Sequence, residues 1–324
     1  MNFDFDAYVT AAAFTEQGCA FALGDGTVHI ETFNPVQAHQ GAILAAAVHP
    51  SGKGLVSGGD DGRLVWSQAG KAVELASIKG RWIDAVATSA ASGLIAYAAG
   101  REVHVIDPAD PAFHNVFVHE KSVAGLAFDP KGRRLACATY GGAALWFARI
   151  AVQKPMMLKW AGSHIFLAFS PDSKFLISSM QENQLHGWRL EGAKDMRMGG
   201  YPAKVKNLAF LAKGAAMATS GAGGAVVWPF AGGSGPMGKE AAEVGFEAGG
   251  QVTAVAAALE GTRLAAGLDD GRVWVMDIRT GKREFLRADK GEAVSALAMS
   301  DDGSRIAWGC EDGAAGVAAA PTLG

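Results

Sequence analysis

Two stretches of the chain decide its fold: residues 55–66 read LVSGGDDGRLVW, and residues 264–277 read LAAGLDDGRVWVMD. In each stretch an apolar run is followed by an Asp-Asp-Gly turn and then by a second apolar run. An Asp-Gly pair between strand-forming residues is a strong signal of a β-hairpin, because the turn needs residues with positive φ. Two such similar hairpins far apart in one chain indicate that the sequence is built from repeats.

The repeat is clearest at a position that is alanine in every copy. Eight short apolar segments, such as VAGLAF and VTAVAA, carry this alanine at Ala13, Ala47, Ala87, Ala127, Ala168, Ala209, Ala256 and Ala298. The steps between copies run from 34 to 47 residues, and a glycine or serine turn follows each alanine. Short strands joined by turns are not a helical repeat, whose apolar residues recur every 3.6 positions. We expect the alanine to mark the closest approach of neighbouring sheets, since packed sheets leave little room there.

One repeat unit is a small twisted sheet that cannot bury both of its faces alone, so the units must cover one another radially. The sequence therefore predicts an all-β fold: a single β-propeller over residues 1–324 with four-stranded antiparallel blades. Eight blades are preferred and seven are the alternative. Phe3-Asp4-Phe5 is expected to complete the last blade and close the ring, because no outer strand remains for it at the C-terminus. The repeat cores are expected at about 8–32, 42–67, 82–107, 122–148, 164–190, 204–230, 251–278 and 293–318.

These hairpins, together with GLAFDPKGRRLACAT at residues 125–139, resemble the WD-repeat family over nearly the whole chain. The Trp-Asp pair of that family is never intact, as Met276-Asp277, Trp188-Arg189 and Trp228-Pro229 show. Family members often tie a blade together with a His, Ser/Thr, Asp and Trp network. The second copy offers all four types in His39, Ser57, Asp61 and Trp66, but Trp66 is one residue early and should face the other side of its strand. In size and in its content of Ala and Gly the chain is similar to stand-alone bacterial WD-repeat proteins.

Composition narrows the classes of function. The net charge of −3 does not favour nucleic-acid or membrane-surface binding, which both need a basic surplus. The N-terminal MNFDFDAYVT carries acidic residues where a secretory signal has basic ones, and three unpaired cysteines fit a reducing cytoplasm.

No nucleophile elbow, zinc-protease motif or phosphate loop is present, so we expect no enzyme activity, no cofactor and no metal. His29, His104 and His186 recur in alternate copies, too far apart to share one ion.

The loops of one propeller rim predict a binding surface for another protein or an extended peptide, presented by a chain that is a monomer by itself. Copies three to six contribute the partner-binding candidates Arg81, Trp82, Arg101, His119, Lys121, Tyr140, Trp160, Tyr201 and Lys204. The remaining copies contribute the acidic residues Glu247, Asp269, Asp270, Asp289, Glu292, Glu311, Asp312, Asp6, Asp25, Asp60 and Asp61. Trp, Tyr and Arg are the residue types most enriched at binding hot spots. The alternative is a small-ligand binder or an accessory protein, possibly related to metal homeostasis, that uses the central channel, where Asp84 and Lys206 occupy matching places.

Overall fold

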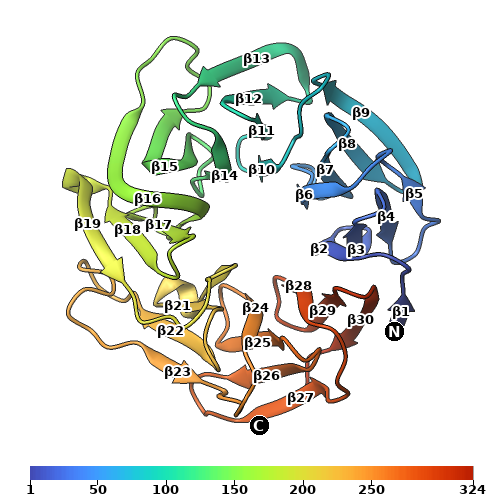
Figure 1. The fold of residues 1–324 in the computed structure, drawn as a ribbon, viewed down its shortest axis with the longest axis vertical. Coiled ribbons are helices and arrows are strands. Elements are labelled where there is room, and N and C mark those ends of the chain that lie inside the picture. The colour runs from blue at the N-terminus through green and yellow to red at the C-terminus, as the bar shows by residue number, and fades with distance from the viewer. Residues whose placement is uncertain (324) are drawn as a thin grey trace. The chain divides into compact units, whose positions relative to one another are not determined.

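The computed structural model describes residues 1–323, and it is an all-β structure with two short 3₁₀ turns. Figure 1 labels the strands, which fold into antiparallel sheets in the order of the sequence. The first three sheets are β2 (Val9–Thr15), β3 (Gly18–Leu23), β4 (Thr27–Ile30), β5 (Val36–Gln37); β6 (Ile43–Val48), β7 (Leu55–Gly59), β8 (Arg63–Gln68), β9 (Lys71–Ser77); and β10 (Ala85–Ser89), β11 (Leu94–Ala99), β12 (Glu102–Asp107), β13 (Asp110–Val118). Four-stranded antiparallel sheets of this kind are the blades of a single β-propeller, which is the predicted fold class.

The other sheets follow the same plan, with one exception in the middle of the chain. They are the six-stranded β14 (Val123–Phe128), β15 (Arg134–Phe147), β16 (Met156–Phe169), β17 (Phe175–Met180), β18 (Leu185–Arg189), β19 (Lys194–Met198); then β20 (Leu208–Leu211), β21 (Ala216–Thr219), β22 (Ala225–Pro229), β23 (Ala242–Val244); β24 (Val252–Ala257), β25 (Arg263–Leu268), β26 (Val273–Asp277), β27 (Arg283–Arg287); and β28 (Val294–Met299), β29 (Arg305–Cys310), β30 (Ala314–Ala319) with β1 (Asn2–Asp4). The 3₁₀ turns are η1 (Glu191–Ala193) and η2 (Ala212–Gly214).

The preference for eight separate blades is therefore wrong: residues 1–323 form seven sheets, the number given as the alternative. The reason lies in the fourth and fifth repeats, which share the six-stranded sheet. Strand β15 folds back on itself, since the N–H of Ala148 donates to the carbonyl of Arg133 at 2.9 Å. Strand β16 pairs with β15 in its first half and with β17 in its second half. A continuous β16 thus serves two sequence repeats, and eight repeats yield seven sheets.

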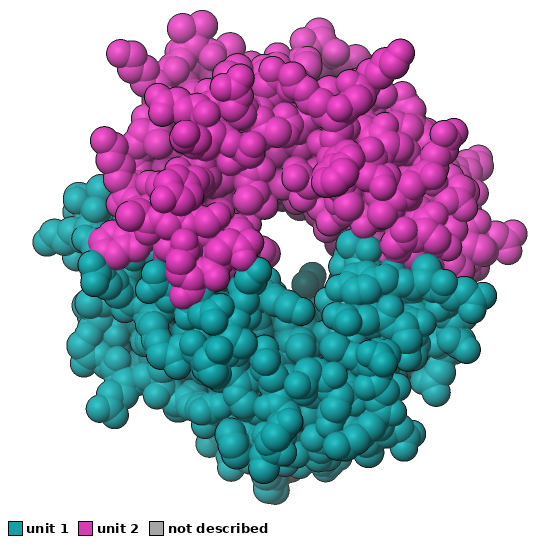
Figure 2. Space-filling view, viewed as in Figure 1, with its two compact units in different colours: residues 1–14, 170–175, 183–324 teal, residues 15–169, 176–182 magenta. Residues whose placement is uncertain are grey.

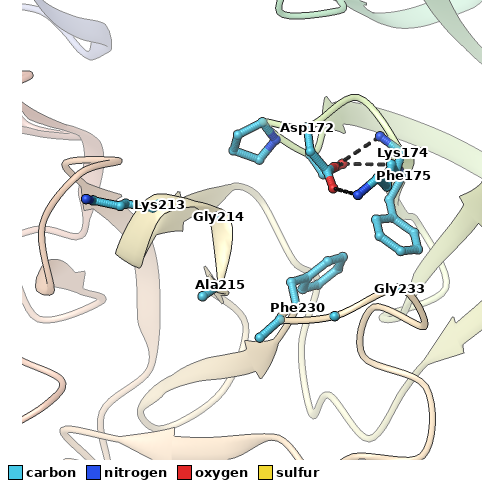
Figure 3. Close-up of a pocket in the computed structure, with 12 residues that line it drawn as sticks. Asp172, Lys174, Phe175, Lys213, Gly214, Ala215, Phe230 and Gly233 are labelled. Atoms are coloured by element: carbon cyan, nitrogen blue, oxygen red, sulfur yellow. Dashed lines mark hydrogen bonds and ion pairs between the residues drawn. The ribbon is translucent and has the colours of Figure 1, made fainter.

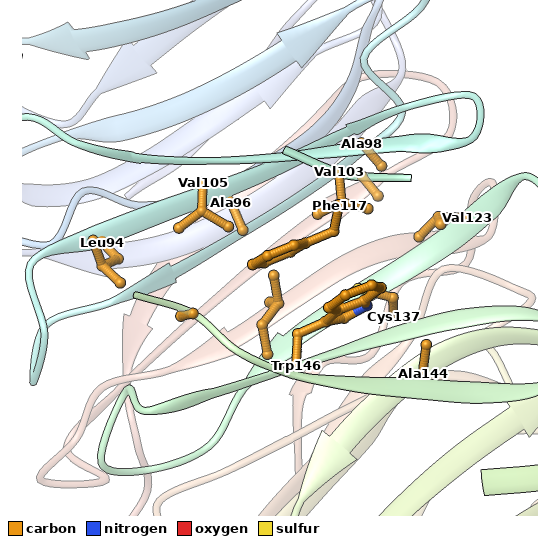
Figure 4. Packing of buried hydrophobic residues seen from close by; sticks show 13 residues of the cluster. Leu94, Ala96, Ala98, Val103, Val105, Phe117, Val123, Cys137, Ala144 and Trp146 are labelled. Carbon is orange, nitrogen blue, oxygen red and sulfur yellow. The ribbon is translucent and has the colours of Figure 1, made fainter. Parts of the chain in front are cut away.

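The chain divides into two compact units, which Figure 2 colours separately. One comprises residues 1–14, 170–175 and 183–324, and the other comprises residues 15–169 and 176–182. In the second unit the sheets of the third and fourth repeats bury a core between them (Figure 4). Its centre is Phe117 stacked on Trp146, with ring centroids 4.5 Å apart. Stacked aromatic pairs of this kind add about 0.5–1.5 kcal/mol beyond the area they bury.

Some close contacts between sheets are made by glycines near the ends of second strands. A Cβ on Gly58 would lie 2.4 Å from Cγ2 of Ile83, and a Cβ on Gly267 would lie 2.4 Å from Cγ1 of Val294. Ile83 and Val294 lie at the beginning of the next sheet, so a β-branched side chain fills the space that glycine leaves. The hydroxyl of Thr253 reinforces one of these contacts by donating to the carbonyl of Val294 at 2.7 Å.

The alanine position lies at sheet interfaces too, on the first strand of each sheet. Ala209 packs against a cluster that contains Val255 of the following sheet. Across its own strand pair Ala209 faces Ala218, and Ala127 faces Ala136. Neighbouring sheets approach one another mainly through the first strands that carry these alanines, as β10 and β14 do, or β24 and β28. That the alanines mark the point of closest approach stays a prediction.

The N-terminal strand pairs with the last sheet, one residue earlier than predicted. Asn2, Phe3 and Asp4 lie opposite Gly316, Ala315 and Ala314 in antiparallel register. The N–H of Phe5 adds a hydrogen bond to the carbonyl of Gly313 at 3.0 Å. The sheet β28-β29-β30 therefore receives its fourth strand from the other end of the chain, while closure of a ring by this strand stays a prediction.

We expect Gly267→Ala to destabilise the protein by about 1–3 kcal/mol, because the added methyl group overpacks the contact with Val294. Urea denaturation measures this free energy of unfolding. Gly233→Ala is the matched control, since a Cβ there meets no atom within 4 Å. Equal stability of the two variants would show that the glycine contact does not constrain the sheets.

Deletion of residues 1–7 should lower the melting temperature markedly and promote aggregation. The deletion removes β1, and strand β30 then presents an unpaired edge. Thermal unfolding and light scattering report the two effects. A truncated protein that melts like the parent would contradict a stabilising role for the N-terminal strand.

Candidate partner-binding surface

The predicted partner-binding residues divide between the two units. Arg81, Trp82, Arg101, His119, Lys121, Tyr140 and Trp160 belong to the unit of residues 15–169 and 176–182, whereas Tyr201 and Lys204 belong to the other. Trp82 and Tyr140 are the most exposed aromatic members, with 64% and 66% of their surface accessible. Each unit is therefore considered by itself, and the surface is built from the residues of the first group.

His119 is buried and holds its sheet together. The indole Nε1–H of Trp146 donates to its Nε2 at 3.0 Å, and its backbone N–H donates to the carbonyl of Arg101 at 2.9 Å. Burial lowers the pKa of His119, so the neutral ring that accepts the indole proton is favoured. His119 does not offer its side chain to a partner. Its role is to anchor the loop that presents Lys121.

Tyr201 has an equivalent role in its own unit. Its hydroxyl lies 2.6 Å from the hydroxyl of Thr219 and accepts a hydrogen bond from the Nε1–H of Trp228 at 2.7 Å. Burial raises its pKa to about 12. Lys204 is half-buried beside the Gly221 turn. Tyr201 is thus a structural residue. Tyr201 and Lys204 belong to a different unit from the other seven candidates.

His119 and Tyr201 share their place in the repeat with His39, which the sequence already indicates as a network residue. His39, His119 and Tyr201 each lie four residues before the apolar residue that begins the next repeat core, Ile43, Val123 and Val205 respectively. In the second repeat the ring of His39 lies 3.0 Å from Asp61 and 2.8 Å from the hydroxyl of Ser57. The shared position marks all three as network residues rather than as surface contacts.

Trp66 stays outside the network of the second repeat, as its early position in the strand predicts. Its indole N–H donates to the carbonyl of Lys53 at 2.7 Å, and its ring stacks on His49 at 3.9 Å. The hydrogen-bond network of this blade therefore joins His39, Ser57 and Asp61 and does not include Trp66.

Two of the remaining candidates, Lys121 and Tyr140, line a groove of about 470 Å³ in the same unit. The other four are not among its lining residues: Arg81, Trp82, Arg101 and Trp160. Its walls come from the end of β13, the loop after it, the turn of β15 and the start of β16. The lining residues include Val118, Lys121, Tyr140, Pro155, Met157 and Lys159. Gly142 brings the β15 turn against β16, since a Cβ there would lie 2.0 Å from the carbonyl oxygen of Leu158. Sequence reasoning found Lys121 and Tyr140 but missed the apolar wall, because Val118 and Met157 lie on outer strands rather than in rim loops.

The groove is apolar in its walls and basic at its border. Val118 is 64% exposed and Met157 is 48% exposed, and the two together give the groove an apolar wall. Two lysines, Lys121 and Lys159, line it against one acid, Glu120. Nearby, Arg81 donates to Glu102 at 2.9 Å, and Glu102 lies opposite Val118 in the strand register. That exposed ion pair contributes little stability.

The acidic candidates of the other unit are not a bare acidic surface. Arg272 pairs with Glu247 at 3.1 Å and with Asp270 at 3.0 Å, and Arg283 pairs with Glu247 at 2.7 Å. Burial opposes ionisation of Asp270, but hydrogen bonds from Arg272 and Lys290 outweigh it and lower its pKa. Two of the predicted acidic residues, Glu247 and Asp270, thus have basic partners within the same unit.

A second pocket, of about 300 Å³, lies in the unit that contains residues 170–175 and 183–324 (Figure 3). The rings of Phe175 and Phe230 meet edge to face at 5.7 Å. The carboxylate of Asp172 accepts hydrogen bonds from the hydroxyl of Ser170 at 2.6 Å and from the N–H of Lys174 at 3.1 Å. These polar groups stabilise a turn of the protein itself, so the pocket is a weaker candidate than the groove.

A family model described as "WD domain, G-beta repeat" matches residues 31–66. That range contains the network of His39, Ser57 and Asp61 and the quoted hairpin of residues 55–66. This match and the propeller fold together support a WD-repeat β-propeller family for the chain. No helix of this WD-repeat protein among residues 1–323 has both the length and the apolar character needed to cross a membrane.

Among solved structures, this WD-repeat propeller is similar to the crystal structure of the computationally designed Ika8 protein. The TM-score is 0.77, the sequence identity is 21%, and the match covers 98% of each chain. At this identity the likeness shows the fold alone. A comparison with curated proteins gave no match.

We expect the WD-repeat propeller to lose stability as the pH falls from about 6.5 towards 4, before most carboxylates titrate. Burial lowers the pKa of His49 to about 4 and also lowers the pKa values of His104, His119 and His164. The unfolded chain, with ordinary histidine pKa values, therefore binds more protons in this window, and protonation favours unfolding. Urea denaturation at stepped pH measures the effect, and His49→Asn should flatten it. A free energy of unfolding that is constant over the window would contradict the burial of neutral histidines.

Proposed function

We propose that this WD-repeat propeller is a non-catalytic protein-interaction scaffold whose groove between β13 and β16 binds an extended, acidic segment of a partner protein. WD-repeat propellers are in general non-catalytic, and they commonly bind other proteins. The observation that supports this proposal most is the pairing of an exposed apolar wall, Val118 and Met157, with Lys121 and Lys159 in one groove.

The groove suits a peptide rather than a small molecule. Its walls include the end of β13 and the start of β16, and an extended segment can lie along these two strands. Tyr140 offers an aromatic ring at one border, and such rings are frequent at the centre of interaction surfaces. Trp82 follows Arg81 in the same unit and is 64% exposed, but it is not among the residues that line the groove.

Charge gives the second part of the proposal. The two lysines at the groove border favour an acidic segment and should speed its approach, more than they raise the final affinity. The apolar contacts with Val118, Met157 and Tyr140 would supply most of the affinity, because burial of apolar area is the larger favourable term.

A selection from a displayed library of random peptides, with the wild-type protein as target, tests this function. We expect the selected peptides to combine acidic and apolar residues. Lys121→Glu together with Lys159→Glu should weaken their binding at least about tenfold, and Trp82→Ala should weaken those that reach it by a similar factor. Lys131→Glu is the control: it makes the same charge change on an exposed turn of the same unit, outside the groove.

Selected peptides that bind the Lys121→Glu, Lys159→Glu variant as tightly as the wild type would place the binding surface elsewhere. A selection that enriches no peptide would also contradict the proposal.

A further inference from the structure

The outer strand β13 differs from the other outer strands of the propeller. With nine residues it is longer than β5, β9, β19, β23 and β27, and after Asp110 it carries no Lys, Arg, Asp or Glu as far as Val118. The outer strands β9, β19 and β27 each carry charged residues. Charges on an edge strand prevent another strand from pairing with it, and β13 lacks this protection.

The backbone groups that β13 turns outwards can be assigned from its register. The N–H of His119 donates to Arg101, and Phe117 and Asn115 lie opposite Val103 and Val105. In an antiparallel pair the residues that exchange hydrogen bonds alternate with those that face away. Since β13 is the last strand of its sheet, the N–H and C=O groups of His114, Val116 and Val118 point to the open edge.

The side chains at this edge agree with that assignment. Asn115 and Phe117 are buried, whereas His114, Val116 and Val118 are exposed. Val118 also lines the groove beside Lys121 and Lys159. The open edge therefore runs directly into the apolar and basic groove.

We propose that the partner segment binds by β-strand addition: it pairs with β13 as an additional strand, and its acidic end lies at Lys121 and Lys159. This inference rests on the proposed function and adds the mode of recognition. In strand addition main-chain hydrogen bonds supply affinity, while alternate side chains supply specificity. The occupant is thus a partner with alternating apolar residues and an acidic end, because that pattern complements the valines of the edge and the two lysines.

A synthetic peptide of alternating threonine and valine that ends in two aspartates is the probe. Two further versions carry N-methyl groups on one or the other set of alternate amides. Only one set faces β13 in a paired strand, so one version should lose binding and the other should bind like the parent. If both N-methylated versions bind like the parent, strand addition is wrong.

The protein side of the test uses a matched pair of variants. Val116→Lys adds a charge at the open edge and should weaken peptide binding at least about tenfold. Val73→Lys makes the same change on β9, where Val73 is 44% exposed against 42% for Val116, and should leave binding unchanged. Amide exchange of Val116 and Val118 should slow when the peptide binds. Exchange rates that do not change would overturn the assignment of the edge.

The outcomes separate this inference from the proposed function. If the alternating peptide does not bind at concentrations up to about 1 mM while selected acidic peptides still depend on Lys121 and Lys159, strand addition fails and the scaffold function stands. If the free protein dimerises and Val116→Lys makes it monomeric, a second copy of this chain occupies the edge, and strand addition by a partner is overturned.

Discussion

Glycine in one sheet against a β-branched residue that begins the next is the contact on which the rest of the structure depends. It recurs at Gly58 with Ile83, at Gly267 with Val294 and at Gly309 with Val9. A four-stranded sheet of alanine-rich strands has little apolar volume of its own, so it gains stability when its neighbour approaches closely. The glycine permits that approach, and hydroxyls such as that of Ser295, which donates to the carbonyl of Val9 at 2.7 Å, hold it.

The close packing of the sheets determines where function can reside. Second strands such as β7, β11 and β17 bury all of their side chains, so the loops and the outer strands offer more surface to a partner. The groove beside β13 combines both, since Tyr140 comes from a turn and Val118 from an outer strand. A surface that closely packed sheets hold in place suits an interaction protein, because a preorganised surface loses less conformational entropy on binding.

Much of the fold was predictable from the sequence, because hairpins repeat in the chain with clear turn signals. The number of sheets was not, since a continuous β16 is indistinguishable in sequence from two strands that meet at a loop. The candidate site was predicted in part. Lys121 and Tyr140 were found, but His119 and Tyr201 are buried, and their spacing before the first strand was the signal that identifies them as network residues. Exposure of Val118 on an outer strand depends on which sheet face is covered, and sequence periodicity does not show that.

A double-mutant cycle at Gly309 and Val9 tests the central claim most directly. A Cβ on Gly309 would lie 2.3 Å from Cγ1 of Val9, so Gly309→Ala should destabilise the protein by about 1–3 kcal/mol. Val9→Ala removes the methyl groups that the new side chain meets. The double variant should therefore be more stable than the sum of the single effects predicts, by about 0.5–3 kcal/mol in the free energy of unfolding. Strict additivity of the two substitutions would contradict the claim that this contact sets the distance between the sheets.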